Sequence, residues 1–163
     1  MNFISRKWLE SRQNKVRETL PNHGLCLDVG SGDFPLFPST INLDRDPVVK
    51  PSVCADALNL PFRRGVFHQV YCNEVVEHLD DHSRFYAELC RVLRFEGRVS
   101  ITSPDESFFW RVIWWFWTRT FGDKWHETHV KCFKIDDLSG FFRVLLISKV
   151  NYFLNFVIGE KVG

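Results

Sequence analysis

Short hydrophobic runs alternate with amphipathic segments along most of this chain. Runs with the length of buried strands stand at 25–29, 40–43, 53–55, 67–72 and 98–102, with two weaker ones at 143–150 and 152–158. Helices are predicted over 5–20, 81–93, 107–119 and 135–142. Strands that alternate with helices in this way are typical of an open, mostly parallel α/β sheet.

Acidic residues and glycines follow the early strands of this pattern. Asp28 ends the first predicted strand and leads into Gly30 and Gly32. Asp44 follows the second predicted strand, and Asp56 follows the third. In open α/β sheets, ligands bind beyond the carboxyl ends of the strands, where the strand order reverses. We therefore expect the functional site at these positions.

The turn after the first strand does not have the pattern of a phosphate-binding loop. Gly30 and Gly32 can adopt a positive φ and bring backbone N–H groups near a ligand. The dinucleotide fingerprint needs a third glycine where this chain has Pro35, and the Gly-Lys-Ser/Thr of a P-loop is absent. Carboxylates at 44 and 56 instead suit a ribose diol and an adenine amino group. The pattern therefore favours an adenosyl group joined to an amino acid.

Four segments carry a more specific resemblance, to the class I S-adenosylmethionine-dependent methyltransferases and most closely to the methyltransferase type 11 group. The successive motifs of that family are similar to LDVGSGDFP, INLDRDP, CADALNLPFRRGVFHQVYCNEVVEHLDD and RVLRFEGRVSITSPD, which together cover roughly residues 24–105. The resemblance implies a single Rossmann-like α/β domain. Its sheet would be twisted and mostly parallel, with an antiparallel C-terminal strand and helices on both faces.

The same resemblance divides the domain and assigns a cofactor. The expected parts are an N-terminal helix (1–23), a cofactor-binding core (24–105), an aromatic lid segment (106–134) and a closing helix with strands (135–163). The cofactor would be S-adenosyl-L-methionine, with S-adenosyl-L-homocysteine as product. Asp44 would bind the ribose diol, and Asp56 would meet the adenine. The implied cofactor-binding residues are Asp28, Gly30, Ser31, Gly32, Asp44, Arg45, Asp56, Ala57, Asn73, Glu74, Val75 and His78.

The chain departs from this family directly after the glycine turn. Phe34 replaces the third glycine of the family's GxGxG turn, and only residues 33–40 separate Gly32 from Ile41. Because DFPLFPST contains two prolines, we expect a loop or one short turn where the family has its first helix. The cofactor pocket would be more open there.

Methyl transfer from a sulfonium mainly needs two partners held in line, with a general base only where the acceptor must lose a proton. The segment WHETHVKCF at 125–133 resembles the family's histidine-containing stretch. We therefore take His129 first and His126 second as candidate catalytic residues, with ordinary loop histidines as the alternative. Together with Cys132 they have the spacing of metal ligands, but a CxxC pair is absent and we expect no metal.

The segment SFFWRVIWWFWTRTFGDKW contains five of the six tryptophans. A helix over 107–119 would be apolar almost all round, which is typical of a helix that is buried or meets something apolar. We interpret it as a lid over a lipid-like, quinone-like or aromatic acceptor, with Trp110 and Trp114 as candidate substrate residues. A core helix, a homodimer contact and a helix in a membrane interface are the alternatives.

Composition narrows the choice of function. The chain has 163 residues and a net charge of +1, which disfavours a nucleic-acid partner. The basic residues near the N-terminus, Arg12 and Arg17 among them, are typical of a solvated helix face. Five scattered cysteines indicate a reducing compartment, so we expect a cytoplasmic protein without a signal peptide and leave peripheral membrane contact open.

The sequence therefore predicts a methyltransferase that acts on a small-molecule or lipid-linked acceptor, at O or C. One alternative is a non-catalytic protein of the same fold that binds a partner through its aromatic helix. A nucleotide-dependent oxidoreductase is a further alternative, which Pro35 disfavours.

Overall fold

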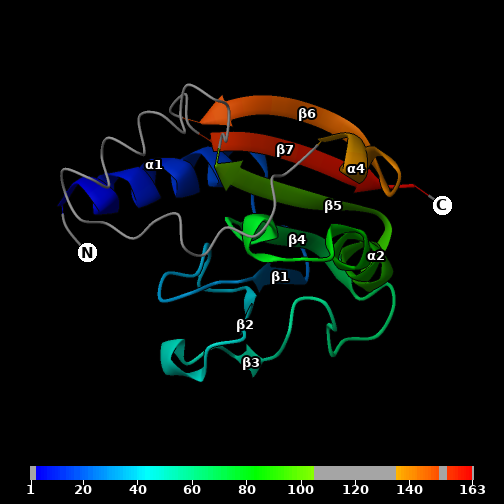
Figure 1. Ribbon diagram of the computed structural model, residues 1–163, viewed down its shortest axis with the longest axis horizontal. Helices are drawn as coiled ribbons and strands as arrows, with labels where there is room; N and C mark the ends of the chain where they lie inside the picture. Colours follow the sequence, from blue (N-terminus) through cyan, green and yellow to red (C-terminus); the bar gives the residue numbers. More distant parts are fainter. Residues whose placement is uncertain (1–2, 105–134, 151–153, 163) are drawn as a thin grey trace.

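Seven strands among the described residues form one sheet, in the order β3-β2-β1-β4-β5-β7-β6 (Figure 1). The structure is a computed structural model that describes residues 3–104, 135–150 and 154–162. The strands are β1 (Cys26–Val29), β2 (Ile41–Asp44), β3 (Val53–Cys54), β4 (Phe67–Asn73), β5 (Leu93–Pro104), β6 (Phe142–Val150) and β7 (Leu154–Lys161). The described helices are α1 (Phe3–Thr19), α2 (His82–Val92) and α4 (Ile135–Ser139), with 3-10 turns η1 (Pro47–Val49) and η2 (Val76–His78).

The order of the strands reverses between β1 and β4. Strand β1 pairs in parallel with both β2 and β4, so that Asp28 lies beside Asn42 on one side and Tyr71 on the other. Strand β5 continues the parallel sheet, whereas β7 runs antiparallel to both β5 and β6. The predicted fold class, a mostly parallel α/β sheet with an antiparallel C-terminal strand, is confirmed. Its switch point lies at the carboxyl ends of β1 and β4.

Helices cover both faces of the sheet. Leu89 of α2 belongs to the same buried cluster as Cys72 of β4. Tyr71 points to the opposite face because side chains alternate along a strand, and there it packs in a cluster with Val16 of α1 and with Leu20, which follows the helix. Helices therefore pack on both faces of the sheet, and this packing holds the carboxyl ends of the parallel strands in one row.

The described elements begin and end close to the predicted ones, with one larger difference at β5. This strand begins at Leu93 and not at position 98, because α2 passes directly into it. Leu93 has an extended backbone, and its N–H still donates to the carbonyl oxygen of Leu89 in α2. The expected loop over 33–40 is confirmed, since it contains only turns and bends. The predicted helix over 107–119 lies outside the described residues.

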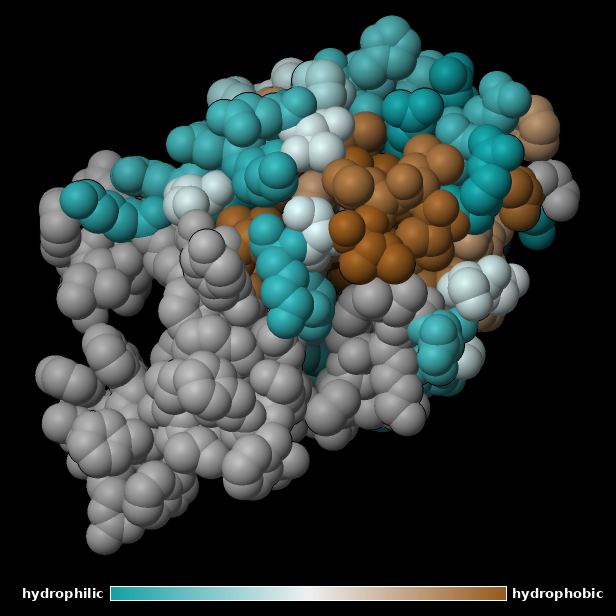
Figure 2. All heavy atoms as spheres, turned by 90° about the horizontal axis from the view of Figure 1, so that it is seen from above, coloured by the Kyte–Doolittle hydropathy of each residue, from teal (hydrophilic) through white to brown (hydrophobic). Residues whose placement is uncertain are grey.

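The edge strand β6 leaves hydrophobic side chains on the surface. Leu145 and Ile147 are exposed, and Figure 2, which views the molecule from the β6 side, shows hydrophobic side chains gathered over this edge. Helix α4 has five residues and β6 has nine, which correspond to about 8 Å and about 30 Å. Helix α4 is therefore too short to cover the length of β6. The side chains of Leu145 and Ile147 remain part of an apolar surface of the described structure.

Candidate functional site

A cavity of about 170 Å³ opens beyond the carboxyl ends of β1, β2, β3 and β4. It lies at the switch point of the sheet, where open α/β folds bind their ligands. Pockets for drug-sized ligands measure roughly 300–1,000 Å³, so this cavity is smaller than such a pocket. The lining residues are Gly30, Leu43, Asp44, Arg45, Ala55, Asp56, Ala57, Glu74, Val75, His78 and Leu79.

Most of the residues that the sequence placed at a cofactor site line this cavity. They are Gly30, Asp44, Arg45, Asp56, Ala57, Glu74, Val75 and His78. Asp28, Ser31, Gly32 and Asn73 are not among the lining residues. Sequence reasoning missed Leu43, Ala55 and Leu79, each of which is the chain neighbour of a residue that it chose. Leu43 and Ala55 are the last residues of the second and third predicted strands, so including each strand's last residue would have found them, whereas Leu79 follows the turn η2.

Asp44 presents both of its carboxylate oxygens at the end of β2. Its Oδ2 accepts a hydrogen bond from Gly32 N at 2.9 Å, and its Oδ1 accepts one from Asp46 N at 2.9 Å. A carboxylate oxygen has two lone pairs, so each oxygen keeps room for a second donor. Two backbone bonds therefore fix the carboxylate, which can still accept a pair of neighbouring hydroxyls.

The glycine turn docks onto β2 and does not offer its backbone to a ligand. Gly30 N and Ser31 N both donate to Leu43 O, at 2.7 and 3.2 Å, and Gly32 N donates to Asp44. These three N–H groups are therefore hydrogen-bonded within the protein, and Gly30 still lines the cavity. With its donors engaged, the turn is no phosphate cradle. The buried Ser31 hydroxyl has no hydrogen-bond partner among the described residues.

Gly30 allows the turn to pass close to the segment that follows β4. Its φ is +67°, a backbone conformation that disfavours a side chain. A Cβ at this position would lie 2.4 Å from Val75 Cγ2, which is much closer than two carbon atoms can approach. Val75 therefore occupies the space that a side chain at position 30 would need, and both residues line the cavity.

Two further acids mark the ends of the cavity. Asp56 follows β3 and is exposed, and its Oδ1 accepts a hydrogen bond from Leu58 N at 2.9 Å. Glu74 follows β4 with a φ of +55°, and its N–H donates to Thr102 O at 3.0 Å. The hydroxyl of Thr102 also donates to Asn73 Oδ1 at 3.3 Å. Strand β5 thus holds the end of β4 and the turn of Glu74.

Asp28 is buried behind the cavity and organises the loop over 33–40. Its side chain is 2% exposed, and its Oδ2 accepts a hydrogen bond from Leu36 N at 2.7 Å. Burial raises the pKa of Asp28 to about 6, against the lowering effects of the Leu36 hydrogen bond and the charge of Arg12. The acid that the sequence placed beside the cofactor therefore holds the shortened loop in place.

The raised pKa of Asp28 predicts a fall in stability as the pH rises. The pKa of Asp28 is about 6 in the folded protein and 3.8 in the unfolded chain, so the folded protein binds this proton more tightly. The free energy of unfolding therefore decreases as the pH rises from 3.8 to about 6. The difference is worth about 3 kcal/mol. Asp28→Asn should remove most of this dependence, and urea unfolding of both proteins from pH 4 to 7 measures it. Parallel pH profiles for the two proteins would contradict the assignment.

Side chains of α1 hold the carbonyl groups of the same loop. Gln13 Nε2 donates to Phe34 O and Arg17 Nε to Leu36 O, both at 2.8 Å, and Arg17 Nη2 donates to Gln13 Oε1 at 3.2 Å. Residues 33–40 have no helix to satisfy their own carbonyls, so the N-terminal helix does so. The interpretation of these basic residues as a solvated face is therefore wrong for Arg17.

Removing Gln13 should loosen this loop. We expect Gln13→Ala to lower the free energy of unfolding by about 1–2 kcal/mol, because Phe34 O loses its donor beside a buried helix face. Glu18→Ala is the matched control, since Glu18 is exposed on the same helix. Denaturant unfolding of the two variants compares them. Equal losses of stability in the two variants would mean that the hydrogen bond from Gln13 to Phe34 O adds no specific stability.

The candidate catalytic and substrate residues lie outside the described residues, so their positions stay predictions. These are His126, His129, Trp110 and Trp114. Over residues 3–104, 135–150 and 154–162, no group of three or more His, Cys, Asp or Glu side chains could hold a metal ion. None of the helices in these ranges has the length and hydropathy needed to cross a membrane.

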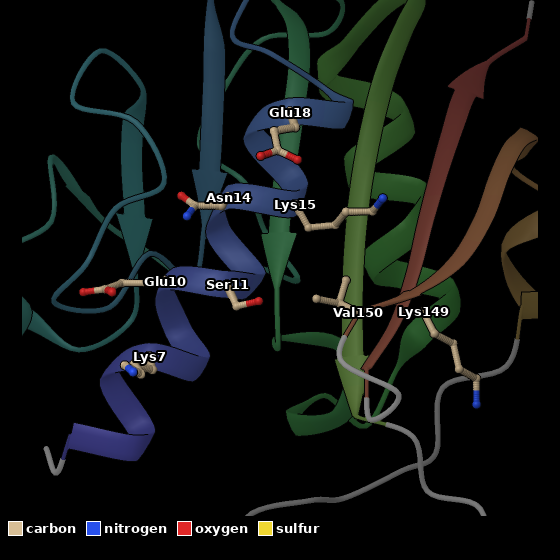
Figure 3. A pocket seen from close by; sticks show the side chains of 8 residues that line it. All are labelled: Lys7, Glu10, Ser11, Asn14, Lys15, Glu18, Lys149 and Val150. Carbon is tan, nitrogen blue, oxygen red and sulfur yellow. The ribbon is translucent and has the colours of Figure 1, made fainter.

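A second and larger hollow lies between α1 and the end of β6 (Figure 3). It measures about 550 Å³, and bases and acids alternate along the helix that lines it, including Lys7, Glu10, Lys15 and Glu18. Lys149 and Val150 line it from β6. None of the described residues that the sequence placed at a functional site lies here. We therefore treat the cavity at the strand ends as the candidate site.

Comparison with known proteins gives the fold a class. Residues 36–101 match a family model described as a methyltransferase domain. The N-methyltransferase NodS from Bradyrhizobium japonicum WM9 has a similar structure, with a TM-score of 0.70 at 12% identity over 96% of this chain and 98% of its own. A structure of the complex between the Haloferax volcanii Trm112 methyltransferase activator and a methyltransferase gives 0.76 at 10% identity, over 97% and 91%.

The [4+2]-cyclase SpnF also has this fold, with a TM-score of 0.71 at 15% identity over 94% of this chain and 82% of its own. The fold is that of the class I methyltransferases. The family model confirms the resemblance over residues 36–101, and the first of the four motifs, LDVGSGDFP, directly precedes this range.

Proposed function

We propose that this protein is an S-adenosylmethionine-dependent methyltransferase whose cofactor lies in the cavity between Asp56 and Glu74. The observation that carries the proposal is the hydrogen bonding of the Asp44 carboxylate at the cavity. Each of its oxygens accepts one backbone N–H and can accept a second donor, and Asp44 lines the cavity. This is the arrangement that a ribose diol requires.

The order of the strands supports one orientation of the ligand. The acids at the cavity follow β3, β2 and β4, and neighbouring strands lie roughly 4.8 Å apart, so the span from β3 to β4 is about 14 Å. Adenine would lie at Asp56, the ribose at Asp44, and the amino-acid end between Gly30 and Glu74. The hydrophobic residues Leu43, Val75 and Leu79 would pack along the ligand.

The cofactor supplies the activated methyl group and the leaving group, so the protein mainly binds and orients. Asp44 and Asp56 would fix the adenosine, and Val75, packed beside Gly30, would close one side of the cavity. Where the acceptor must lose a proton, His129 and then His126 remain our candidate bases, in a segment that resembles the family's histidine-containing stretch.

Our proposal for the acceptor rests on the sequence alone. We take it to be a small or lipid-linked molecule, methylated at O or C, that meets the apolar segment over 107–119 through Trp110 and Trp114. We retain the predicted division of the domain into a cofactor-binding core over 24–105 and an aromatic lid over 106–134. A cytoplasmic location, with contact to a membrane surface or a second copy through 107–119, belongs to the same proposal.

Transfer of a labelled methyl group tests this function. The purified protein is incubated with methyl-labelled S-adenosylmethionine and a panel of lipid, quinone and phenol acceptors, and extracts are compared with those from Asp44→Ala. Label that appears in one acceptor class and depends on Asp44 supports the proposal and names the acceptor. Tight binding of the cofactor without transfer to any acceptor would favour the alternative, a non-catalytic protein that binds a partner.

A further inference from the structure

An arginine of the N-terminal helix contacts the acid that lines the cavity after β4. Arg12 Nη1 lies 2.6 Å from Glu74 Oε1, and the two side chains are 13% and 17% exposed. Glu74 itself lines the cavity, and its backbone is held by Thr102 of β5. The contact joins α1 to a fixed turn at the ligand site, so Arg12 is not part of a solvated helix face.

Two acids interact with this guanidinium, one by contact and one through its charge. Glu74 contacts it directly, and the positive charge of Arg12 acts on the buried carboxyl of Asp28. Asp28 precedes the glycine turn at the end of β1, and Glu74 follows β4. Arg12 therefore lies at the switch point, on the side opposite to Asp44 and Asp56. One cation together with two acids is a charge pattern that suits a ligand with both a negative and a positive group.

One donor of this arginine has no acceptor. The Nε of Arg12 is buried and has no hydrogen-bond partner among the described residues. A buried donor of a charged group is costly when it stays unpaired. A guanidinium presents its N–H groups in a planar fork that matches a carboxylate, so the vacant edge of Arg12 has the geometry of a carboxylate site.

We infer that Arg12 binds the carboxylate at the amino-acid end of the ligand, while Glu74 positions Arg12 and accepts the ligand's ammonium group. This inference rests on the proposed function and deepens it, because it assigns a specificity-determining residue outside the matched methyltransferase domain. The site then distinguishes adenosyl ligands with an amino-acid tail from those without one. The N-terminal helix becomes part of the binding site.

Two ligands separate this role from a general effect on the fold. S-adenosylhomocysteine carries the amino-acid tail, whereas 5′-methylthioadenosine keeps the adenosine and lacks the tail. The dissociation constants of both are measured by calorimetry for the wild type, Arg12→Gln and Arg12→Lys. Lys15→Gln, which removes a charge from the same helix without touching the cavity at the strand ends, is the matched control.

Arg12→Gln should weaken S-adenosylhomocysteine binding by roughly 10- to 100-fold, the value of charge-assisted hydrogen bonds, and leave methylthioadenosine binding within about twofold. Arg12→Lys should fall between wild type and Arg12→Gln, because it keeps the charge and loses the fork. The control should bind both ligands as the wild type does. Thermal unfolding confirms that each variant is folded.

The results that overturn the inference are distinct from those that overturn the function. Equal weakening of both ligands by Arg12→Gln, or no weakening of either, would make Arg12 a structural residue and leave the cofactor site intact. A folded wild type that binds neither ligand would remove the proposed function, and the role of Arg12 with it. If Arg12→Gln does not fold, the ratio of the two ligands for Arg12→Lys decides alone, and an unchanged ratio overturns the inference.

Discussion

Asp44→Ala should weaken the binding of S-adenosylhomocysteine by roughly 100-fold, or ~3 kcal/mol. The carboxylate would accept both ribose hydroxyls, and alanine leaves these hydroxyls without a partner in the site. The change also frees Gly32 N and Asp46 N, which the two oxygens of Asp44 hold at 2.9 Å. Calorimetric titration at constant pH and salt measures the loss.

Asp46→Ala is the matched control for this experiment. Asp46 is an exposed acid two residues further along, and its Oδ1 caps the turn η1 by accepting from Val48 N at 2.9 Å. It does not line the cavity. Its removal should lower stability by about 1 kcal/mol, as the loss of a cap does, and leave the affinity unchanged. Equal effects of the two substitutions on affinity would exclude Asp44 from the ligand.

Gly30→Ala should have the second large effect, on stability and binding together. Alanine at a φ of +67° costs about 1 kcal/mol, and its Cβ would lie 2.4 Å from Val75 Cγ2, so the turn or Val75 must move. We expect a total loss of about 2–4 kcal/mol in the free energy of unfolding and no measurable binding of S-adenosylhomocysteine. Denaturant unfolding and calorimetry measure the two effects.

Two further variants separate the conformational cost from the clash. Gly32→Ala has a similar φ, of +53°, but nothing lies within 4 Å of the added Cβ, so only the conformational cost should appear. In the double variant Gly30→Ala/Val75→Ala the clashing Cγ2 is gone, and part of the lost stability should return. A Gly30→Ala variant as stable as Gly32→Ala would show that Val75 does not restrict the turn.

The residues at the strand ends could be predicted because their roles depend on local sequence. Asp44 ends β2 and Asp56 follows β3, and the parallel sheet brings the carboxyl ends of these strands into one row. The prolines at 35 and 38 likewise predicted the loop over 33–40, since proline disfavours a helix interior. In both cases the signal lies within a few residues of the feature.

Contacts between distant segments could not be predicted in this way. The pairing of Arg12 with Glu74, and the donors from Gln13 and Arg17 to the loop carbonyls, depend on how α1 packs against the sheet. In a single sequence, nothing distinguishes the basic and polar residues of this helix that make these contacts from those that face solvent. The engagement of the glycine turn with Leu43 O was also missed, because hydropathy does not reveal where backbone donors point.

The fold alone does not decide the chemistry. A [4+2]-cyclase and an N-methyltransferase both share it with this chain at 15% identity or below. Function must therefore be argued from the site, where Asp44, Asp56, Glu74 and Gly30 line one cavity at the switch point and Arg12 of α1 contacts Glu74.

Calorimetric titration of the folded wild-type protein with S-adenosylhomocysteine tests the central claim most directly. The account predicts saturable binding at one site per chain, with an affinity that falls in Asp44→Ala and not in Asp46→Ala. Absence of binding by a protein with a cooperative unfolding transition would contradict it. The cavity at the strand ends would then be no cofactor site, and the function would have to be sought elsewhere on the molecule.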